Sequence, residues 1–253
     1  MGTFVITGGA SGIGKAIADK LRDDGHNCLS LDLQTADIVA DLSSPAGRQQ
    51  AAKDIEAATA GELSGLVTSA GVGSHLPDMG LITEVNYFGT VELVEALRPL
   101  LARNRASVLL VSSNSAPMPT NDDFVDRLLD GDREAARALA ESMHGQQVYS
   151  GTKQAVTRWM RRHTVACAEA GIRINAIGPG YTRTPLSLAA EDHPQYGEAI
   201  KQFIATIPIG RPGQPEDMAE AASFLLSERA SFICGAMLYV DGGHDAMMRP
   251  DAL

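Results

Sequence analysis

The chain has 253 residues, of which 44% are hydrophobic and 21% charged, proportions that are ordinary for one large soluble globular domain. Its formal net charge of −10 argues against nucleic acid or an anionic membrane as the main partner, because both require a basic surface. No apolar run is long enough to span a bilayer, and a strand is expected from Thr3, so we expect a cytoplasmic protein without a signal peptide. The three cysteines are widely spaced, with no histidine at metal-ligand spacing, so we expect neither a disulfide nor a metal site.

Apolar strand patterns alternate with amphipathic helical patterns along the chain. Strands are expected at residues 3–7, 27–33, 37–42, 65–69, 107–113, 172–177 and 236–240, and helices at 13–22, 45–59, 81–102, 149–169 and 215–226. Such alternation predicts βαβ units, and strands that are apolar throughout predict burial on both faces. We therefore predict an α/β fold: a single-domain, Rossmann-type, doubly wound parallel sheet of about seven strands.

Residues 117–145 interrupt this alternation. Pro117 and Pro119 end the strand, Asn121 can cap a short helix, and Gly131 separates it from an alanine-rich second helix. A connection of about thirty residues is long for a compact domain, so we predict an inserted helical subdomain. It is either a surface appendage, a wall over the active site or an oligomer contact.

The turn after the first strand carries three glycines in the spacing G-x-x-x-G-x-G. Gly8 can adopt a positive φ, Gly12 lets backbone N–H groups approach a pyrophosphate, and Gly14 lets helix and strand pack closely. Ser11 and Ile13 complete the turn, and the following helix directs its positive end at the phosphates. Between a strand and a helix, this turn predicts dinucleotide binding.

Asp32 ends the second strand, where a carboxylate can accept hydrogen bonds from the adenosine ribose and repel a 2′-phosphate. No cation follows Leu33, so NAD is favoured over NADP; the alternative is a solvated acid at a strand end. Asp41 and Leu42, at the end of the third strand, give a weaker signal for contacts with the adenine.

Tyr149 and Lys153 are four residues apart on an expected helix and therefore share one face. A phenol with a pKa near ~10 is a poor base, but a nearby ammonium and an oxidised nicotinamide can lower that pKa. The phenol can then take a proton from an alcohol while hydride leaves for the cofactor, or reverse the reaction on a ketone. Ser113, at the end of the fifth strand, can position the substrate oxygen.

Together these motifs resemble the short-chain dehydrogenase/reductase family over nearly the whole chain. The resemblance implies that Ser113 binds the substrate oxygen, that Tyr149 is the acid/base, and that Lys153 binds the nicotinamide ribose and lowers the pKa of Tyr149. It also implies that Asn86 holds a water in the proton relay. The implied cofactor residues further include Ala70, Gly71, Pro179 and Gly180, with either Thr182 or Thr184 bonding the carboxamide.

Two departures from the family pattern stand out. Ser69 replaces the usual asparagine before Ala70, which puts the bracing of the sheet there in doubt, and Ser113 and Tyr149 are separated by the insertion. The insertion, residues 85–89, residues 194–198 and the tail 241–250 are similar to bacterial 3α-hydroxysteroid dehydrogenase/carbonyl reductases.

The resemblance implies NAD(H)-dependent interconversion of a secondary alcohol and a ketone on a bulky apolar substrate of hydroxysteroid type. The alternatives are a reductase of smaller or aryl ketones, an acyl-chain ketoreductase, or a non-catalytic NAD-binding regulator. Residues 181–209 are expected to select the substrate, and could form an apolar lid or ordinary helix core; the apolar ones are Pro185, Leu186, Leu188, Tyr196, Phe203 and Ile204. In this family the helices at 82–101 and 146–170 commonly form dimer faces, so we expect a homodimer, with a tetramer as the alternative.

Overall fold

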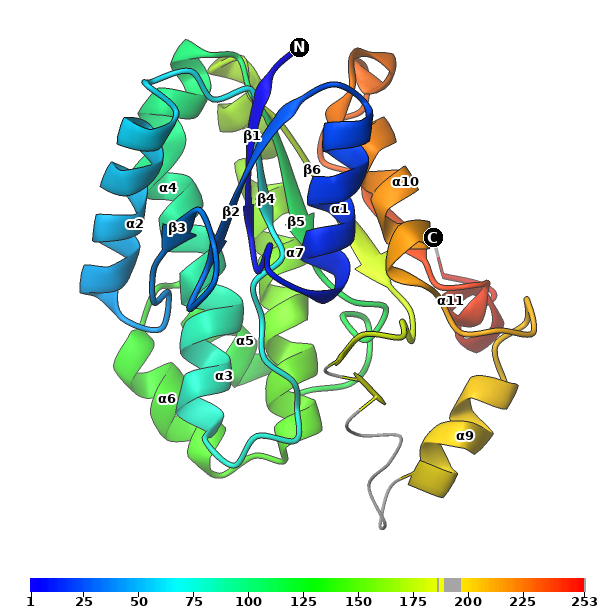
Figure 1. Cartoon of the computed structure of the whole chain (residues 1–253). Helices are drawn as coiled ribbons and strands as arrows, with labels where there is room; N and C mark the ends of the chain where they lie inside the picture. The colour runs from blue at the N-terminus through cyan, green and yellow to red at the C-terminus, as the bar shows by residue number, and fades with distance from the viewer. Residues whose placement is uncertain (186, 189–196, 253) are drawn as a thin grey trace.

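The computed structural model describes residues 1–185, 187–188 and 197–252 (Figure 1). Seven parallel strands form one sheet in the order β3-β2-β1-β4-β5-β6-β7. The strands are β1 (Thr3–Thr7), β2 (Asn27–Asp32), β3 (Ile38–Val39), β4 (Gly65–Thr68), β5 (Ser107–Val111), β6 (Arg173–Pro179) and β7 (Met237–Val240). The predicted doubly wound α/β sheet is confirmed.

Helices cover both faces of the sheet. α1 (Gly12–Asp23) and α10 (Pro215–Leu226) pack together on one face, whereas α2 (Pro45–Ala58), α4 (Gly89–Arg103) and α7 (Gly145–Glu169) lie on the other (Figure 1). Neighbouring strand residues point into opposite layers: Val5 belongs to the core under α2, α4 and α7, and Ile6 to the core under α1 and α10. Burial on both sides explains why the central strands are apolar at every position.

The helix expected at 81–102 contains a π-helical turn. α3 (Met79–Thr83) runs into η1 (Glu84–Phe88), a π-helical segment, and continues as α4. Such turns widen a helix locally and are frequent at functional sites. Here the widened turn carries Asn86, one of the predicted site residues.

The inserted segment forms two helices, α5 (Asp122–Leu129) and α6 (Arg133–Glu141). The Asn121 side chain caps α5 by accepting from the Phe124 backbone N–H at 3.2 Å, and Gly131 adopts a φ of +74° between the helices. α5 packs on α7, and α6 packs on α3. Phe124 is fully buried against Gly151 of α7, so the insertion is joined to the main core.

Other elements differ modestly from the expected ones. The third strand has only two residues, and the fifth ends before the serine pair. α11 (His244–Met248) and the 3₁₀ turn η2 (Glu228–Ala230) lie in segments for which the sequence predicted no helix. α9 (Gly197–Ala205) lies within 181–209, where helix core was one of the two expected alternatives. Across the described ranges no helix has both the length and the apolar character needed to cross a membrane.

Candidate active site

A cavity of about 960 Å³ opens at the carboxyl ends of the strands. Every residue that the sequence predicted for cofactor binding lines this cavity, although the residues come from distant parts of the chain. They are Gly8, Ser11, Gly12, Ile13, Gly14, Asp32, Leu33, Asp41, Leu42, Ala70, Gly71, Tyr149, Lys153, Pro179, Gly180, Thr182 and Thr184. The parallel sheet brings them together because all its strands end at one edge.

The three glycines of the first turn are required for different steric reasons. Gly8 has a φ of +67°, and a Cβ there would lie 2.8 Å from the Ala70 backbone nitrogen. A Cβ on Gly14 would lie 2.2 Å from the Gly8 carbonyl oxygen, so α1 can start only with glycine at this position. Gly12 has a φ of +52° and faces Thr184 across the cavity. Side chains at these three positions would fill the space inside the turn, so glycines keep it open as a cradle.

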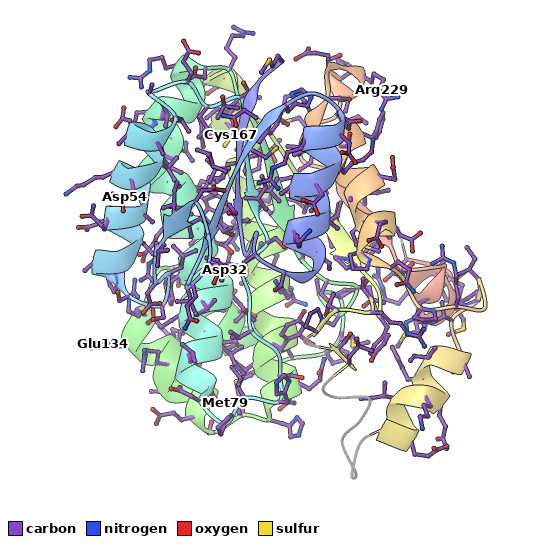
Figure 2. The ribbon with its side chains drawn as sticks, viewed as in Figure 1. Asp32, Asp54, Met79, Glu134, Cys167 and Arg229 are labelled. Atoms are coloured by element: carbon purple, nitrogen blue, oxygen red, sulfur yellow. The ribbon has the colours of Figure 1, made fainter. Side chains whose placement is uncertain are left out.

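Asp32 is held against this cradle (Figure 2). One carboxylate oxygen accepts from the Ala10 backbone N–H at 3.1 Å, and the other accepts from the Leu33 backbone N–H at 2.8 Å. These bonds fix the carboxylate at the mouth of the cavity and leave acceptor capacity free for a diol.

Tyr149 and Ser113 meet across the cavity, from α7 and from the loop after β5. The Ser113 hydroxyl lies close enough to Tyr149 to lower the pKa of the phenol, but burial raises that pKa by more, so the net shift is upward. The Ser113 Oγ also accepts from the Ser115 hydroxyl at 3.0 Å and the Ser115 backbone N–H at 3.1 Å. The serine oxygen is thus fixed at a position where it can bond a substrate oxygen beside the phenol.

Lys153 lies behind the tyrosine, one helical turn further along α7. Its ammonium is buried, lies 5.7 Å from the centroid of the Tyr149 ring and donates to the Val111 carbonyl at 2.9 Å. Burial lowers the pKa of Lys153 to about 8. The ammonium was expected to lower the pKa of Tyr149, but burial of the phenol raises it.

Asn86 does not line the cavity but lies directly behind Gly71. Its side-chain oxygen accepts from the Val72 backbone N–H at 2.8 Å, and its amide donates to the Val72 carbonyl at 3.0 Å. A Cβ on Gly71 would lie 3.2 Å from the Asn86 oxygen and 3.7 Å from the Lys153 nitrogen. The π-helical turn therefore braces the strand end after β4. The bracing at Ser69 that the sequence put in doubt is supplied in part by Thr7, whose Oγ1 accepts from the Ala70 backbone N–H at 3.0 Å.

Part of the cavity was not predicted from sequence. Of the apolar residues expected in a lid, Pro185 and Phe203 line the cavity, whereas Leu188 and Ile204 do not. Leu186 and Tyr196 lie outside the described residues. So do residues 194–196 of the segment 194–198, which was expected to match the bacterial enzymes. Further lining residues are Asn114, Ser115, Met118 and Gln146. Asn114 and Ser115 follow Ser113 at a strand end, a signal that could have identified them. Met118 is the single described residue of 117–145 on the cavity wall, so α5 and α6 do not form the predicted wall.

The comparisons with known proteins agree with this arrangement. Residues 3–123 match the family model described as short chain dehydrogenase, and residues 135–245 match the model described as Enoyl-(Acyl carrier protein) reductase. The 3-alpha-hydroxysteroid dehydrogenase/carbonyl reductase of Comamonas testosteroni is 40% identical, and the alignment covers 99% of each chain. The chain belongs to the short-chain dehydrogenase/reductase family.

Two further proteins are similar to this chain over nearly its whole length. The crystal structure of the 3-alpha-hydroxysteroid dehydrogenase from Pseudomonas sp. B-0831 complexed with NADH has a TM-score of 0.95 and 41% identity, covering 99% of this chain and 100% of that one. The cis-4-hydroxycyclohexanecarboxylate dehydrogenase of Sinomonas cyclohexanicum is 32% identical over 96% of each chain. The predicted family and oxidoreductase class are confirmed.

Proposed function

We propose that this enzyme interconverts a secondary alcohol and a ketone on a bulky apolar substrate of the hydroxysteroid type, with NAD(H) as cofactor. The observation that carries the proposal is the meeting of Ser113, Tyr149 and Lys153 at one cavity with the glycine cradle and Asp32. The Comamonas relative, named for a steroid and a carbonyl activity, supports the same class.

The residues present fit a dinucleotide. The turn at Gly12, where α1 begins, offers backbone N–H groups to a pyrophosphate, and the positive end of α1 favours its charge. The Asp32 carboxylate suits a ribose diol and repels a 2′-phosphate, which favours NAD over NADP. Asp41, Leu42, Ala70 and Gly71 would border the adenosine half. Leu33, Ile13 and Ser11 complete that border, and Pro179, Gly180 and either Thr182 or Thr184 would border the nicotinamide.

The cofactor, when bound, accepts or donates the hydride. The side chains of the protein bind the substrate oxygen and transfer the proton. Ser113 holds the substrate oxygen beside Tyr149, and the phenol removes or returns the proton at that oxygen. The Lys153 ammonium stabilises the phenolate and would bond the nicotinamide ribose. Asn86 braces the neighbouring strand end and would hold a relay water.

The shape of the substrate end supports a bulky apolar molecule. Met118, Pro185 and Phe203 present apolar surface beside the catalytic group. A smaller cyclic alcohol is the second candidate, supported by the 32% identity to a dehydrogenase of a hydroxycyclohexane carboxylate. An NAD-linked absorbance screen over 3α-hydroxysteroids, terpenoid alcohols, cyclohexanols and aryl alcohols would separate the two.

The variant Tyr149→Phe tests the proposed function. We expect turnover to fall by at least about a thousandfold, because the proton acceptor is lost, while NADH binding measured by fluorescence stays within about twofold. A non-catalytic NAD-binding regulator would keep its function in this variant. Retained turnover would contradict the role of the phenol, and failure of the wild-type protein to bind NADH would contradict the whole proposal.

Residues 1–253 would act as one dinucleotide-binding domain, with 117–145 as an insertion within it. We expect a cytoplasmic homodimer, in line with the net charge of −10 and the exposed apolar side chains on the carboxyl-terminal elements.

A further inference from the structure

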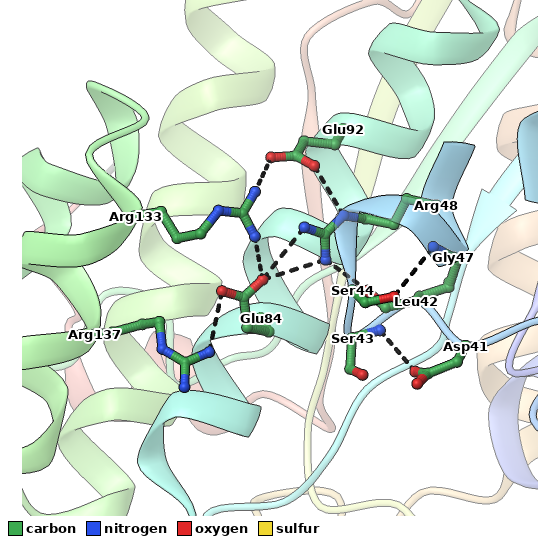
Figure 3. A network of polar contacts seen from close by, with 10 residues as sticks. All are labelled: Asp41, Leu42, Ser43, Ser44, Gly47, Arg48, Glu84, Glu92, Arg133 and Arg137. Carbon is green, nitrogen blue, oxygen red and sulfur yellow. Dashed lines mark hydrogen bonds and ion pairs between the residues drawn. The ribbon is translucent and has the colours of Figure 1, made fainter. Parts of the chain in front are cut away.

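A network of charged residues with a buried centre joins the insertion to the rest of the molecule (Figure 3). Its members, called the Arg48 network below, are Arg48 on α2, Glu84 on η1, Glu92 on α4, and Arg133 and Arg137 on α6. Three separate stretches of the chain, α2, the continuous segment of η1 and α4, and α6, therefore contribute to one cluster.

Arg48 is at the centre of this network and is 1% exposed. Its Nε donates to Glu92 at 2.8 Å, and Nη1 and Nη2 donate to one oxygen of Glu84 at 3.3 Å. Nη1 also donates to the backbone carbonyl of Leu42 at 2.7 Å. Arg48 thus connects two carboxylates to the backbone of a residue on the nucleotide cavity.

The insertion supplies the charges that balance the two carboxylates. Arg133 donates to both Glu84 and Glu92, and its guanidinium lies 4.3 Å from the ring centroid of Phe88. Arg137 donates to the second oxygen of Glu84 at 3.3 Å. Glu84 is 3% exposed, and a buried carboxylate requires such partners because desolvation is costly.

Leu42 is also packed closely against the start of α4. A Cβ on Gly89, at the start of α4, would lie 3.3 Å from the Leu42 carbonyl oxygen and 3.4 Å from its Cβ. Leu42 therefore lies between Gly89 and the cavity, with its carbonyl bonded to Arg48. A shift of the Arg48 guanidinium would move the cavity wall at this point.

We propose that Arg48 is a positioning residue for the adenine side of the cavity, and that the inserted helices set its orientation through Glu84 and Glu92. This inference rests on the proposed use of NAD(H). It assigns the segment 117–145 a role in cofactor affinity, which acts from behind the cavity wall and not through contact with substrate.

Arg133 and Arg137 are the residues to replace, because neither touches the cavity. In the variant Arg133→Met/Arg137→Met, Glu84 and Glu92 compete for Arg48 alone. The hydrogen bond from Arg48 to the Leu42 carbonyl is therefore expected to weaken. We expect the Kd for NADH and for ADP-ribose to rise about tenfold, equivalent to the loss of one charge-assisted hydrogen bond. Reduced nicotinamide mononucleotide, which lacks the adenosine half, should bind unchanged, and kcat at saturating NAD should stay within about twofold. Arg48→Met should show the same pattern of ligand affinities.

Arg127→Met is the matched control, because Arg127 lies on the insertion and, among the described residues, forms ion pairs only with Asp123 and Asp132. It should bind all three ligands like wild type. Equal losses for ADP-ribose and the mononucleotide would overturn the proposal, since they would indicate general loosening. So would wild-type affinities in the double variant.

Two precautions keep the test decisive. If the double variant does not fold, Arg137→Met replaces it; Arg137 is partly exposed and contacts only Glu84 in the network, so a loss of about threefold in ADP-ribose affinity is expected. Wild-type affinity in that variant would overturn the proposal.

If wild-type protein itself binds no NADH, the proposed function fails. If wild type binds NADH and the variants do not differ from it, only the inference about the Arg48 network fails.

Discussion

At the scale of single residues, the site depends on Tyr149 and Lys153, two side chains whose burial disfavours their charged forms. Burial raises the pKa of the Tyr149 hydroxyl and lowers that of Lys153 to about 8. Both side chains are therefore biased towards neutrality. Binding an oxidised nicotinamide would add positive charge and favour the phenolate, which links cofactor binding to activation of the acid/base.

Lys153 gives a prediction for stability against pH. Its pKa is about 8 in the folded protein and near 10.5 when unfolded, so between these values only the unfolded chain binds the proton. Stability should therefore fall as pH drops through this window and change little from this cause below it. Relative to Lys153→Met, the ligand-free wild type should gain about 2 kcal/mol in unfolding free energy between pH 7 and pH 10. Urea titrations at four pH values measure this, and parallel pH curves for the two proteins would refute it.

Asp32 gives a prediction for cofactor choice. Asp32→Asn keeps an oxygen that can accept from Ala10 but removes the charge that repels a 2′-phosphate. We expect the KM for NAD to rise about tenfold and the ratio of kcat/KM for NADP over NAD to rise by at least that factor. Asp19→Asn removes the same charge from an exposed position on α1 and should leave the ratio unchanged. An unaltered ratio in Asp32→Asn would argue for a merely solvated acid.

At the scale of elements, the inserted helices are joined to the core by packing and by charge. Phe124 of α5 is buried against α7, which carries the catalytic tyrosine, and α6 contributes two arginines to the network around Glu84. These contacts argue against a loosely attached surface appendage. The π-helical turn η1 places Glu84 towards the insertion and Asn86 behind the cavity. One short segment therefore both contacts the insertion and supports the cavity wall.

Gly151 gives a prediction for this packing. A Cβ at this position would lie 2.8 Å from the Phe124 ring, closer than real contacts allow. Gly151→Ala should destabilise the protein by about 1–3 kcal/mol, because an overpacked core must shift. Adding Phe124→Leu should recover part of that loss, which identifies the ring as the obstacle. Denaturant midpoints of the two single variants and the double variant test it; additive losses would contradict the proposed contact.

At the scale of the whole molecule, the apolar surface is uneven. Phe224 on α10, Phe232 after η2 and Leu238 on the edge strand β7 are exposed, with Phe232 fully so, and α10, η2 and β7 are linked by contacts. An edge strand beside exposed apolar side chains is typical of a surface that is covered in an assembly. On the opposite side of the sheet, α5 covers part of α7, one of the helices expected to form a dimer face.

The assembly prediction follows from this asymmetry. Light scattering should give twice the 26.7 kDa of one chain, through the carboxyl-terminal face and not through α4 and α7. Phe232→Ser should raise the dimer dissociation constant by at least about tenfold, since a buried aromatic side chain contributes more than 1.4 kcal/mol. Val165→Ser, at an exposed position on α7, should leave it unchanged. A monomeric wild type would refute the dimer, and a mass four times that of one chain would indicate the tetramer.

The sequence by itself determined the sheet, the family and many of the residues that line the cavity at the strand ends. These depend on local signals: apolar strands alternate with helices, glycines follow one strand, and Tyr149 and Lys153 share a helical face. Strand ends of a parallel sheet meet at one edge, so chain order alone was enough to bring Asp32, Ser113 and Gly180 together. The strand and helix ends differed by a few residues, because final turns depend on neighbouring elements.

Only the tertiary structure decided what depends on burial and on contacts between distant residues. Whether Tyr149 is more or less acidic than a free phenol depends on how much water its surroundings exclude, which no spacing encodes. Arg48 and Glu84 look like ordinary helix charges in sequence, yet folding buries both and joins them to arginines of the insertion. Desolvation and pairing act through space, so the role of the insertion became visible only once the chain was folded.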